Sequence, residues 1–127
     1  MKFQPDTVDD ANAISRHEPG RIWVGTASYA HSVLVPWTGA VQAWPVDDFD
    51  ALQPVHFEAV LALKPDLVIF GSGARLRFAS AALMRSLIER RIGVETMDTA
   101  AACRTYNVLV SERRPVVAAL LLGAAPN

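Results

Sequence analysis

The sequence predicts an α/β domain built on a central mixed sheet, and both halves of the chain indicate this. Residues 67–70 form a short apolar run between the turn signals Pro65-Asp66 and Gly71-Ser72-Gly73, a pattern typical of a strand buried on both faces. A helical segment and another β-rich run follow, which predicts a βαβ unit with parallel strands. The first half instead holds β-rich segments joined by short turns, which favours antiparallel pairing.

Composition predicts one domain and argues against one class of partner. The chain has 127 residues, of which 51% are hydrophobic, enough for a single core. We expect one domain over residues 20–123, with an arm at 1–19 and a tail at 124–127. The net charge of −1 predicts no nucleic-acid partner, because general nucleic-acid binders carry a strong basic excess. The charge is uneven: residues 1–66 carry nine acidic and four basic side chains, whereas residues 67–127 carry four acidic and eight basic ones.

Cysteine content and the apolar runs predict the compartment. The only cysteine, Cys103, excludes an intrachain disulfide and fits a reducing environment. Residues 1–10 lack the apolar core of a secretory signal. The longest apolar run, residues 116–122, is too short to cross a bilayer. We therefore expect a cytoplasmic protein without membrane insertion.

The first half of the chain predicts an irregular arm followed by an antiparallel β-meander. Residues 1–19 contain two prolines and few large apolar side chains, so we expect them to be irregular apart from the start of an edge strand at 2–3. Residues 21–25, 32–37 and 40–44 have the β-branched or alternating pattern of strands. Their connections are too short for helical crossovers, which predicts a three-stranded meander.

Two helices are predicted around the central strand. Acidic residues at 47–50 precede apolar residues at helical spacing, which predicts a helix over residues 53–63. Ser80 is expected to cap a second helix that ends near Arg90-Arg91. Its inner stripe is predicted to consist of Leu83, Leu87 and Ile88.

The last third of the chain predicts a strand, a helix and a closing strand. Residues 92–97 should form a strand parallel to 67–70, with a right-handed crossover between them. Asp98 or Thr99 can cap a third helix over residues 100–110. Residues 116–122 read as a buried strand.

The glycine loop Gly71-Ser72-Gly73 has two interpretations. It is not a P-loop, because no Gly-Lys-Ser/Thr follows, and Leu76 stands where a dinucleotide fingerprint needs its third glycine. In the first interpretation the glycines let the chain turn sharply off a buried strand. In the second the loop cradles an anion through its N–H groups and Ser72, with help from Arg75 and Arg77.

Asp98 and Thr99 end the neighbouring parallel strand, so they should lie close to the glycine loop. Asp98 either only caps the third helix or also faces the crevice as an acid, base or ligand anchor. Ligands of open α/β sheets bind outside the carboxyl ends of the strands, which makes this edge the candidate site.

Cys103 lies in the first turns of the third helix, with Asn107 one turn later on the same face. It is either a small core residue or a nucleophile, and a nucleophile needs a histidine base. The three histidines (His17, His31 and His56) all lie in the first half of the chain. This scarcity of histidine and cysteine argues against a zinc site, and no motif indicates a cofactor.

One stretch carries a family resemblance. The pattern Asp-Thr-x-x-Ala-Cys-x-x-Tyr-Asn-x-Leu at 98–109, with the glycine loop and the strand before it, resembles the domain of unknown function 498 family, the Mth938-like domains. That family includes a mitochondrial complex I assembly factor and an adipogenesis-associated protein. The resemblance implies a three-layer fold whose last strand runs against the others. The family positions that map here are Gly71, Gly73, Asp98, Thr99, Cys103, Tyr106 and Asn107, and they mark a common pocket region.

The sequence therefore supports three hypotheses. The first is a non-enzymatic interaction or assembly-factor module with an unknown protein partner, since no catalytic constellation is evident and the family has no established enzymatic activity. The second is a small-anion or nucleotide site between the loop 71–73 and Asp98. The third is a thiol enzyme that uses Cys103. The oligomeric state is not predicted by any of these patterns.

Overall fold

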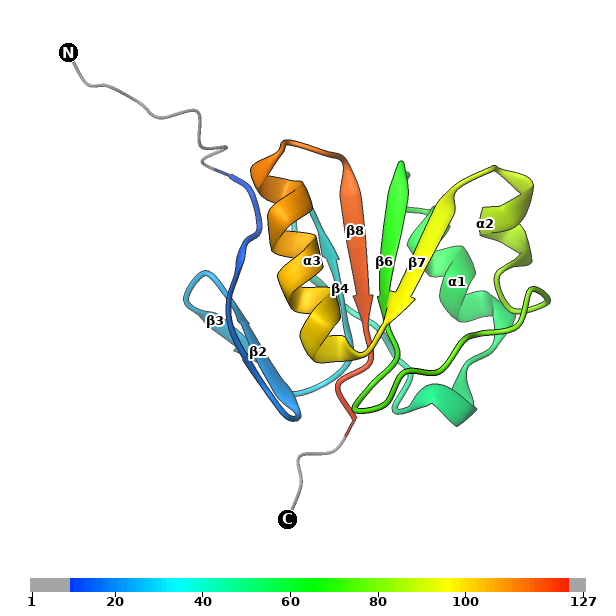
Figure 1. The fold of residues 1–127 in the computed structure, drawn as a ribbon, viewed down its shortest axis with the longest axis horizontal. Helices are drawn as coiled ribbons and strands as arrows, with labels where there is room; N and C mark the ends of the chain where they lie inside the picture. The colour runs from blue at the N-terminus through cyan, green and yellow to red at the C-terminus, as the bar shows by residue number, and fades with distance from the viewer. Residues whose placement is uncertain (1–9, 124–127) are drawn as a thin grey trace.

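The structure, a computed structural model, describes residues 10–123 and shows an α/β fold in three layers (Figure 1). A five-stranded sheet of order β5-β4-β8-β6-β7 lies in the middle. Helix α3 (Thr99–Ser111) packs on one face of this sheet, and α1 (Pro54–Leu61) and α2 (Arg85–Glu89) pack on the other. The fold class expected from the sequence is confirmed.

The central sheet is mixed. It contains β4 (Val33–Pro36), β5 (Gln42–Ala43), β6 (Leu67–Gly71), β7 (Gly93–Met97) and β8 (Val116–Leu120). Strand β6 is parallel to both β7 and β8, whereas β4 is antiparallel to β5 and β8. The last strand therefore runs against β4 but with β6, which corrects the direction that the resemblance implied. The reason is that α3 returns the chain to the end where β7 began, so β7-α3-β8 is a second βαβ crossover.

Strand β8 is buried on both faces, and its side chains alternate between two cores. Val116, Ala118 and Leu120 face the core under α3, and Val117 and Ala119 face the core under α1 and α2. Burial on both faces explains the uninterrupted apolar sequence of this strand and of β6.

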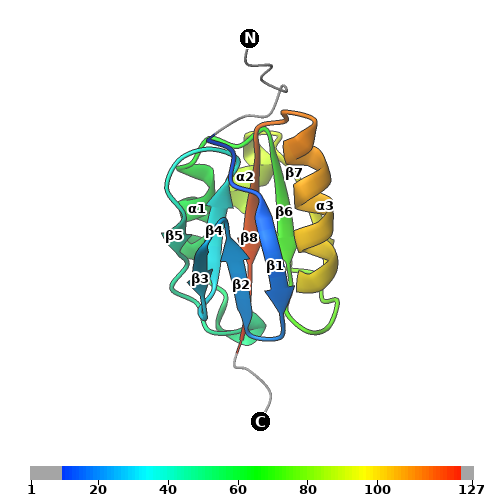
Figure 2. The same cartoon turned by 90° about the vertical axis from the view of Figure 1, so that its left-hand side faces the viewer.

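The first half of the chain departs from the prediction. Strands β1 (Ile14–Glu18), β2 (Arg21–Val24) and β3 (Ala27–Tyr29) form a separate antiparallel sheet, which packs beside α3 (Figure 2). The prediction that the segments at 21–25, 32–37 and 40–44 form one meander was wrong. The first segment is β2 of the separate sheet, and only the other two, as β4 and β5, join the central sheet. The prediction of an irregular arm was wrong for residues 14–18, which form the edge strand β1. The sequence of this strand is mostly polar, and only Ile14 is buried. The expected strand at residues 2–3 and the tail at 124–127 lie outside the described residues.

The helices follow the predicted order with one shorter element. Helix α1 begins at a proline after a 3₁₀ turn at Phe49–Ala51. The Oγ atom of Ser80 accepts a hydrogen bond from the Leu83 N–H (3.3 Å), but α2 proper begins five residues later. The inner stripe holds for the buried Leu87 and is wrong for Ile88, which is 49% exposed. Asp98 caps α3 by accepting the Ala101 N–H at 2.9 Å.

Candidate functional site

The carboxyl ends of β6, β7 and β8 meet at one edge of the sheet, as Figure 1 shows at the bottom of the molecule. Gly71 is in register with Met97 on β7 and with Leu120 on β8. Two backbone hydrogen bonds extend this pairing past the strands: the Ser72 N–H donates to the Met97 carbonyl (2.9 Å), and the Leu121 N–H donates to the Gly71 carbonyl (3.0 Å). The glycine loop and the start of α3 are thereby held side by side.

Thr99 joins the glycine loop, α3 and the end of β8. Its Oγ1 accepts the Gly73 N–H at 2.9 Å and donates to the Leu121 carbonyl at 2.7 Å. Its own N–H donates to the Gly73 carbonyl at 2.9 Å. Gly71 permits this approach, because a Cβ there would lie 2.9 Å from both Thr99 Oγ1 and a methyl of Leu120. Only a glycine fits at position 71.

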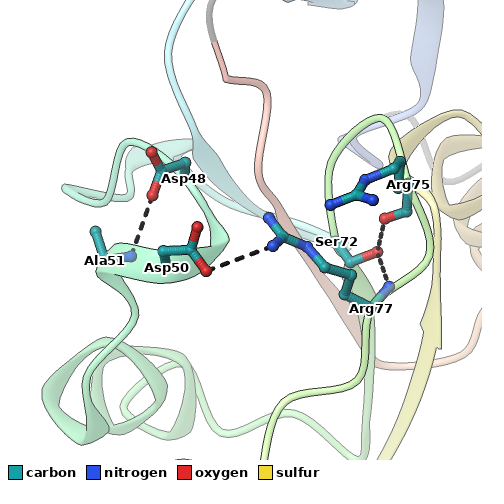
Figure 3. Close-up of polar contacts among 6 residues, drawn as sticks. All are labelled: Asp48, Asp50, Ala51, Ser72, Arg75 and Arg77. Atoms are coloured by element: carbon teal, nitrogen blue, oxygen red, sulfur yellow. Dashed lines mark hydrogen bonds and ion pairs between the residues drawn. The ribbon is translucent and has the colours of Figure 1, made fainter.

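Ser72 organises the loop that follows (Figure 3). Its buried hydroxyl donates to the Arg75 carbonyl (2.7 Å), lies 3.3 Å from the Met97 carbonyl and accepts the Arg77 N–H (3.0 Å). The Arg77 guanidinium turns to the 3₁₀ turn, where it pairs with Asp50 at 3.4 Å and stacks over Phe49. Ser72 and Arg77 thus have structural partners.

A cleft of about 680 Å³ opens beside the glycine loop, between the start of α3 and the β1–β2 turn. This volume is within the range of pockets that bind small ligands or an inserted side chain. Gly73, Asp98 and Thr99 are the expected site residues that line it. The other lining residues are His17, Glu18, Pro19, Gly20, Ile22, Ala74, Ala100, Leu121 and Leu122.

Besides His17 and Thr99, the polar side chains that line the cleft are acidic. One carboxylate oxygen of Asp98 accepts the helix-capping hydrogen bond, and the other oxygen has no hydrogen-bond partner among residues 10–123. Glu18 on the opposite wall forms an exposed ion pair with Arg16 at 3.1 Å. No lysine or arginine of the described chain lines the cleft, so Arg75 and Arg77 lie outside it. The arrangement suits an apolar group with a hydrogen-bond donor better than an anion.

The other expected site residues lie in the core rather than in the cleft. Cys103 is fully buried, and burial raises the pKa of its thiol to about 12, although Arg104 opposes this shift. The Tyr106 hydroxyl donates to the Pro36 carbonyl at 3.0 Å, and burial raises its pKa as well. Asn107 accepts the Ile14 N–H and donates to the Ile14 carbonyl, both at 2.8 Å. Tyr106 and Asn107 therefore connect α3 to β4 and to β1.

Sequence reasoning missed His17 and Glu18 as wall residues of the cleft. Both belong to β1, which the sequence presented as part of an irregular arm. The available signal was Pro19-Gly20, a tight turn between two polar-apolar segments that could have predicted a hairpin.

Residues 10–123 contain neither a metal-binding cluster nor a membrane-spanning helix. No three histidine, cysteine, aspartate or glutamate side chains lie close enough together to hold a metal ion. None of the helices in this part of the chain has the length and apolar character needed to cross a membrane.

The family assignment rests on a match that spans most of the chain. A family model described as "Protein of unknown function (DUF498/DUF598)" matches residues 14–121. The chain belongs to the DUF498/DUF598 family. The match begins at β1 and ends after β8, so the family domain includes both sheets.

Individual relatives have diverse names. A crystal structure of a Bordetella parapertussis protein superposes with a TM-score of 0.83 at 31% identity, covering 97% of this chain and 100% of that one. The NADH dehydrogenase (ubiquinone) 1 alpha subcomplex assembly factor 3 of Danio rerio is 34% identical over 92 residues, 71% of this chain and 51% of the relative. The 13 kDa major membrane protein of Francisella tularensis is 23% identical over 91% of this chain and 95% of the relative. The chain therefore spans about half the length of the matched assembly factor.

Proposed function

We propose that this DUF498/DUF598 protein is a non-enzymatic interaction module of the assembly-factor type. It binds another protein through the loop of residues 72–84, which connects β6 to α2. The observation that carries the proposal is an exposed apolar pair on this loop: Phe78 is 71% exposed and Leu76 is 52% exposed. Phenylalanine is enriched in protein interfaces relative to the rest of the surface, and exposed apolar patches mark interaction sites.

The loop holds these side chains in place without a partner. The Ser72 hydroxyl closes the first end of the loop, and the Arg77 guanidinium connects its middle to Asp50 of the 3₁₀ turn (Figure 3). The same guanidinium stacks over Phe49. Its last part is closed by the Ser80 hydroxyl. A loop that is already ordered loses little conformational entropy on binding, which favours its use as a recognition surface.

The interior of the protein supports a binding role over catalysis. The one thiol, that of Cys103, is buried and protonated at neutral pH, since burial raises its pKa to about 12. The Thr99 and Ser72 hydroxyls are both engaged with backbone groups. A nucleophile needs an adjacent base, and within residues 10–123 none of these three groups is hydrogen-bonded to a histidine or a carboxylate.

The relative from Danio rerio suggests the kind of partner. Its name describes an assembly factor of the NADH dehydrogenase alpha subcomplex, and its matched segment covers 71% of this chain. We extend this role to the present protein as a proposal: it holds a subunit of a larger complex during assembly. A cytoplasmic location fits the lone reduced cysteine.

A comparative pull-down tests the proposal. Tagged wild type, Leu76→Ser/Phe78→Ser and Val55→Ser are used to capture partners from the native cell, and the captured proteins are quantified and probed for NADH dehydrogenase subunits. Val55 is a matched control, because it is 57% exposed and lies on α1 rather than on the loop. We expect one defined partner that the control retains and the loop variant loses. Equal capture by all three proteins would show that the loop is not the binding surface.

A further inference from the structure

The edge of the central sheet opposite to the cleft is lined by three basic turns. Each of the three α-helices ends in one of these turns, immediately before a strand of the parallel group begins, at the top of Figure 1. The turn after α1 carries Lys64, the turn after α2 carries Arg90 and Arg91, and the turn after α3 carries Arg113 and Arg114. All five side chains are exposed.

Strand register places the three turns next to one another. Leu67 at the start of β6 is in register with Gly93 on β7 and with Val116 on β8. The Asp66 N–H also donates to the Pro115 carbonyl at 2.9 Å, just before the two strands pair. Neighbouring strands lie about 4.8 Å apart, so the basic turns share an edge roughly 10 Å wide.

The backbone of these turns is unusual. Lys64, Arg91 and Arg113 have φ values of 54°, 59° and 62°, and they are the non-glycine residues with positive φ in the described part of the chain. Glycine is the residue that normally ends a helix in this left-handed conformation, because a Cβ atom is disfavoured there. A basic side chain at the end of a helix also favours the helix dipole. The dipole explains one charge per helix, but not the adjacent pairs Arg90-Arg91 and Arg113-Arg114.

The composition of the edge indicates its ligand. Asp66, Glu89 and Glu112 lie in the same turns, so five basic and three acidic side chains leave a net charge of +2. Two exposed apolar side chains flank the turns, Ile88 near the end of α2 (49% exposed) and Val108 near the end of α3 (55% exposed). These helices lie on opposite faces of the sheet (Figure 1), so the two apolar residues come from elements on either side of the basic edge.

We propose that this edge binds the surface of an anionic lipid bilayer. Lysine and arginine are attracted to anionic headgroups, and Ile88 and Val108 can enter the interface beside them. The opposite end of the molecule carries Glu18 and Asp98 at the cleft, so the charge asymmetry turns the cleft away from the bilayer. RNA fits the edge less well, because the described turns offer no aromatic side chain on which a base could stack. The small net charge predicts weak, reversible association.

Co-sedimentation with lipid vesicles tests the proposal. The intact protein is mixed with vesicles of equal parts phosphatidylcholine and phosphatidylglycerol, or of phosphatidylcholine alone, at low and high salt. We expect binding to the anionic vesicles only, and its loss when NaCl rises to about 0.5 M, where charge interactions are screened. Lys64→Gly/Arg91→Gly should bind about 25-fold more weakly, since each basic residue contributes about fivefold at such a surface.

The glycine variant separates binding from folding. Glycine suits the positive φ at both positions, so the melting temperature of the Lys64→Gly/Arg91→Gly variant should stay within about 3 °C of that of the wild type. The matched control Arg75→Gln/Arg104→Gln removes the same charge from the cleft-side loop and from the first half of α3, and it should bind like wild type. Absence of binding to anionic vesicles at low salt, equal weakening by the control, or tighter binding to polyuridylate RNA than to vesicles would each overturn the proposal.

Discussion

Replacing Gly71 by alanine tests the packing that holds the candidate site together. A Cβ at this position would lie 2.9 Å from Leu120 Cδ2, 2.9 Å from Thr99 Oγ1 and 3.1 Å from Thr99 Cα. The Leu120 methyl can move, but Thr99 is held by its backbone and by its two side-chain hydrogen bonds to Gly73 and Leu121. The added methyl therefore has to displace the start of α3 from the end of β6.

The expected cost follows from the contacts that are lost. Forcing a methyl into a packed site costs about 1–3 kcal/mol, and each of the two hydrogen bonds of Thr99 contributes about 1 kcal/mol. We expect the free energy of unfolding to fall by about 3 kcal/mol, which corresponds to a melting temperature lower by roughly 10 °C for a domain of this size. Urea unfolding followed by circular dichroism measures it.

The same substitution on the neighbouring strand provides the control. Gly93 begins β7, and a Cβ there would meet only Leu67 Cδ1, at the ordinary distance of 3.4 Å. Gly93→Ala should change the free energy of unfolding by less than about 0.5 kcal/mol. If Gly71→Ala proves as stable as Gly93→Ala, the close approach of Thr99 to β6 does not stabilise this protein, and our account of the site edge is wrong.

Three further substitutions test the residues that connect α3 to its surroundings. Thr99→Val should lower the free energy of unfolding by about 2 kcal/mol, and it should cost less in a Gly71→Ala background, because both changes break the same contacts. Asn107→Leu removes both hydrogen bonds to Ile14, so amide exchange should accelerate in β1 and β2 while β6 stays protected. Burial raises the pKa of Cys103 from 9.0 to about 12, so the folded protein keeps a proton that the unfolded chain releases. Wild type should therefore lose about 1.4 kcal/mol more stability than Cys103→Ala between about pH 8 and 10 in urea titrations; equal losses would contradict this.

The stretch that carries the family resemblance provides one local helix cap and several tertiary connections. Asp98 caps α3, Thr99 binds the glycine loop and β8, Tyr106 binds the end of β4, and Asn107 binds β1. The sequence predicted that Asp98 and Thr99 lie at the strand end. It did not predict the partners of Tyr106 and Asn107, because these are backbone groups 70 and 93 residues away along the chain.

Local pattern was sufficient for the second half of the chain. Burial and helix initiation are visible here in residues that are neighbours in sequence: the apolar run before Gly71, the capping Asp98 and the apolar run from Val116. The βαβ unit and its site edge could therefore be predicted. Where the first-half strands belong was decided by tertiary structure. A short strand with a half-polar sequence, such as β1, fits either sheet, and only packing against α3 selects one. The cleft has the same origin, since its two walls come from β1 and from the glycine loop, which meet only after both sheets have packed on α3.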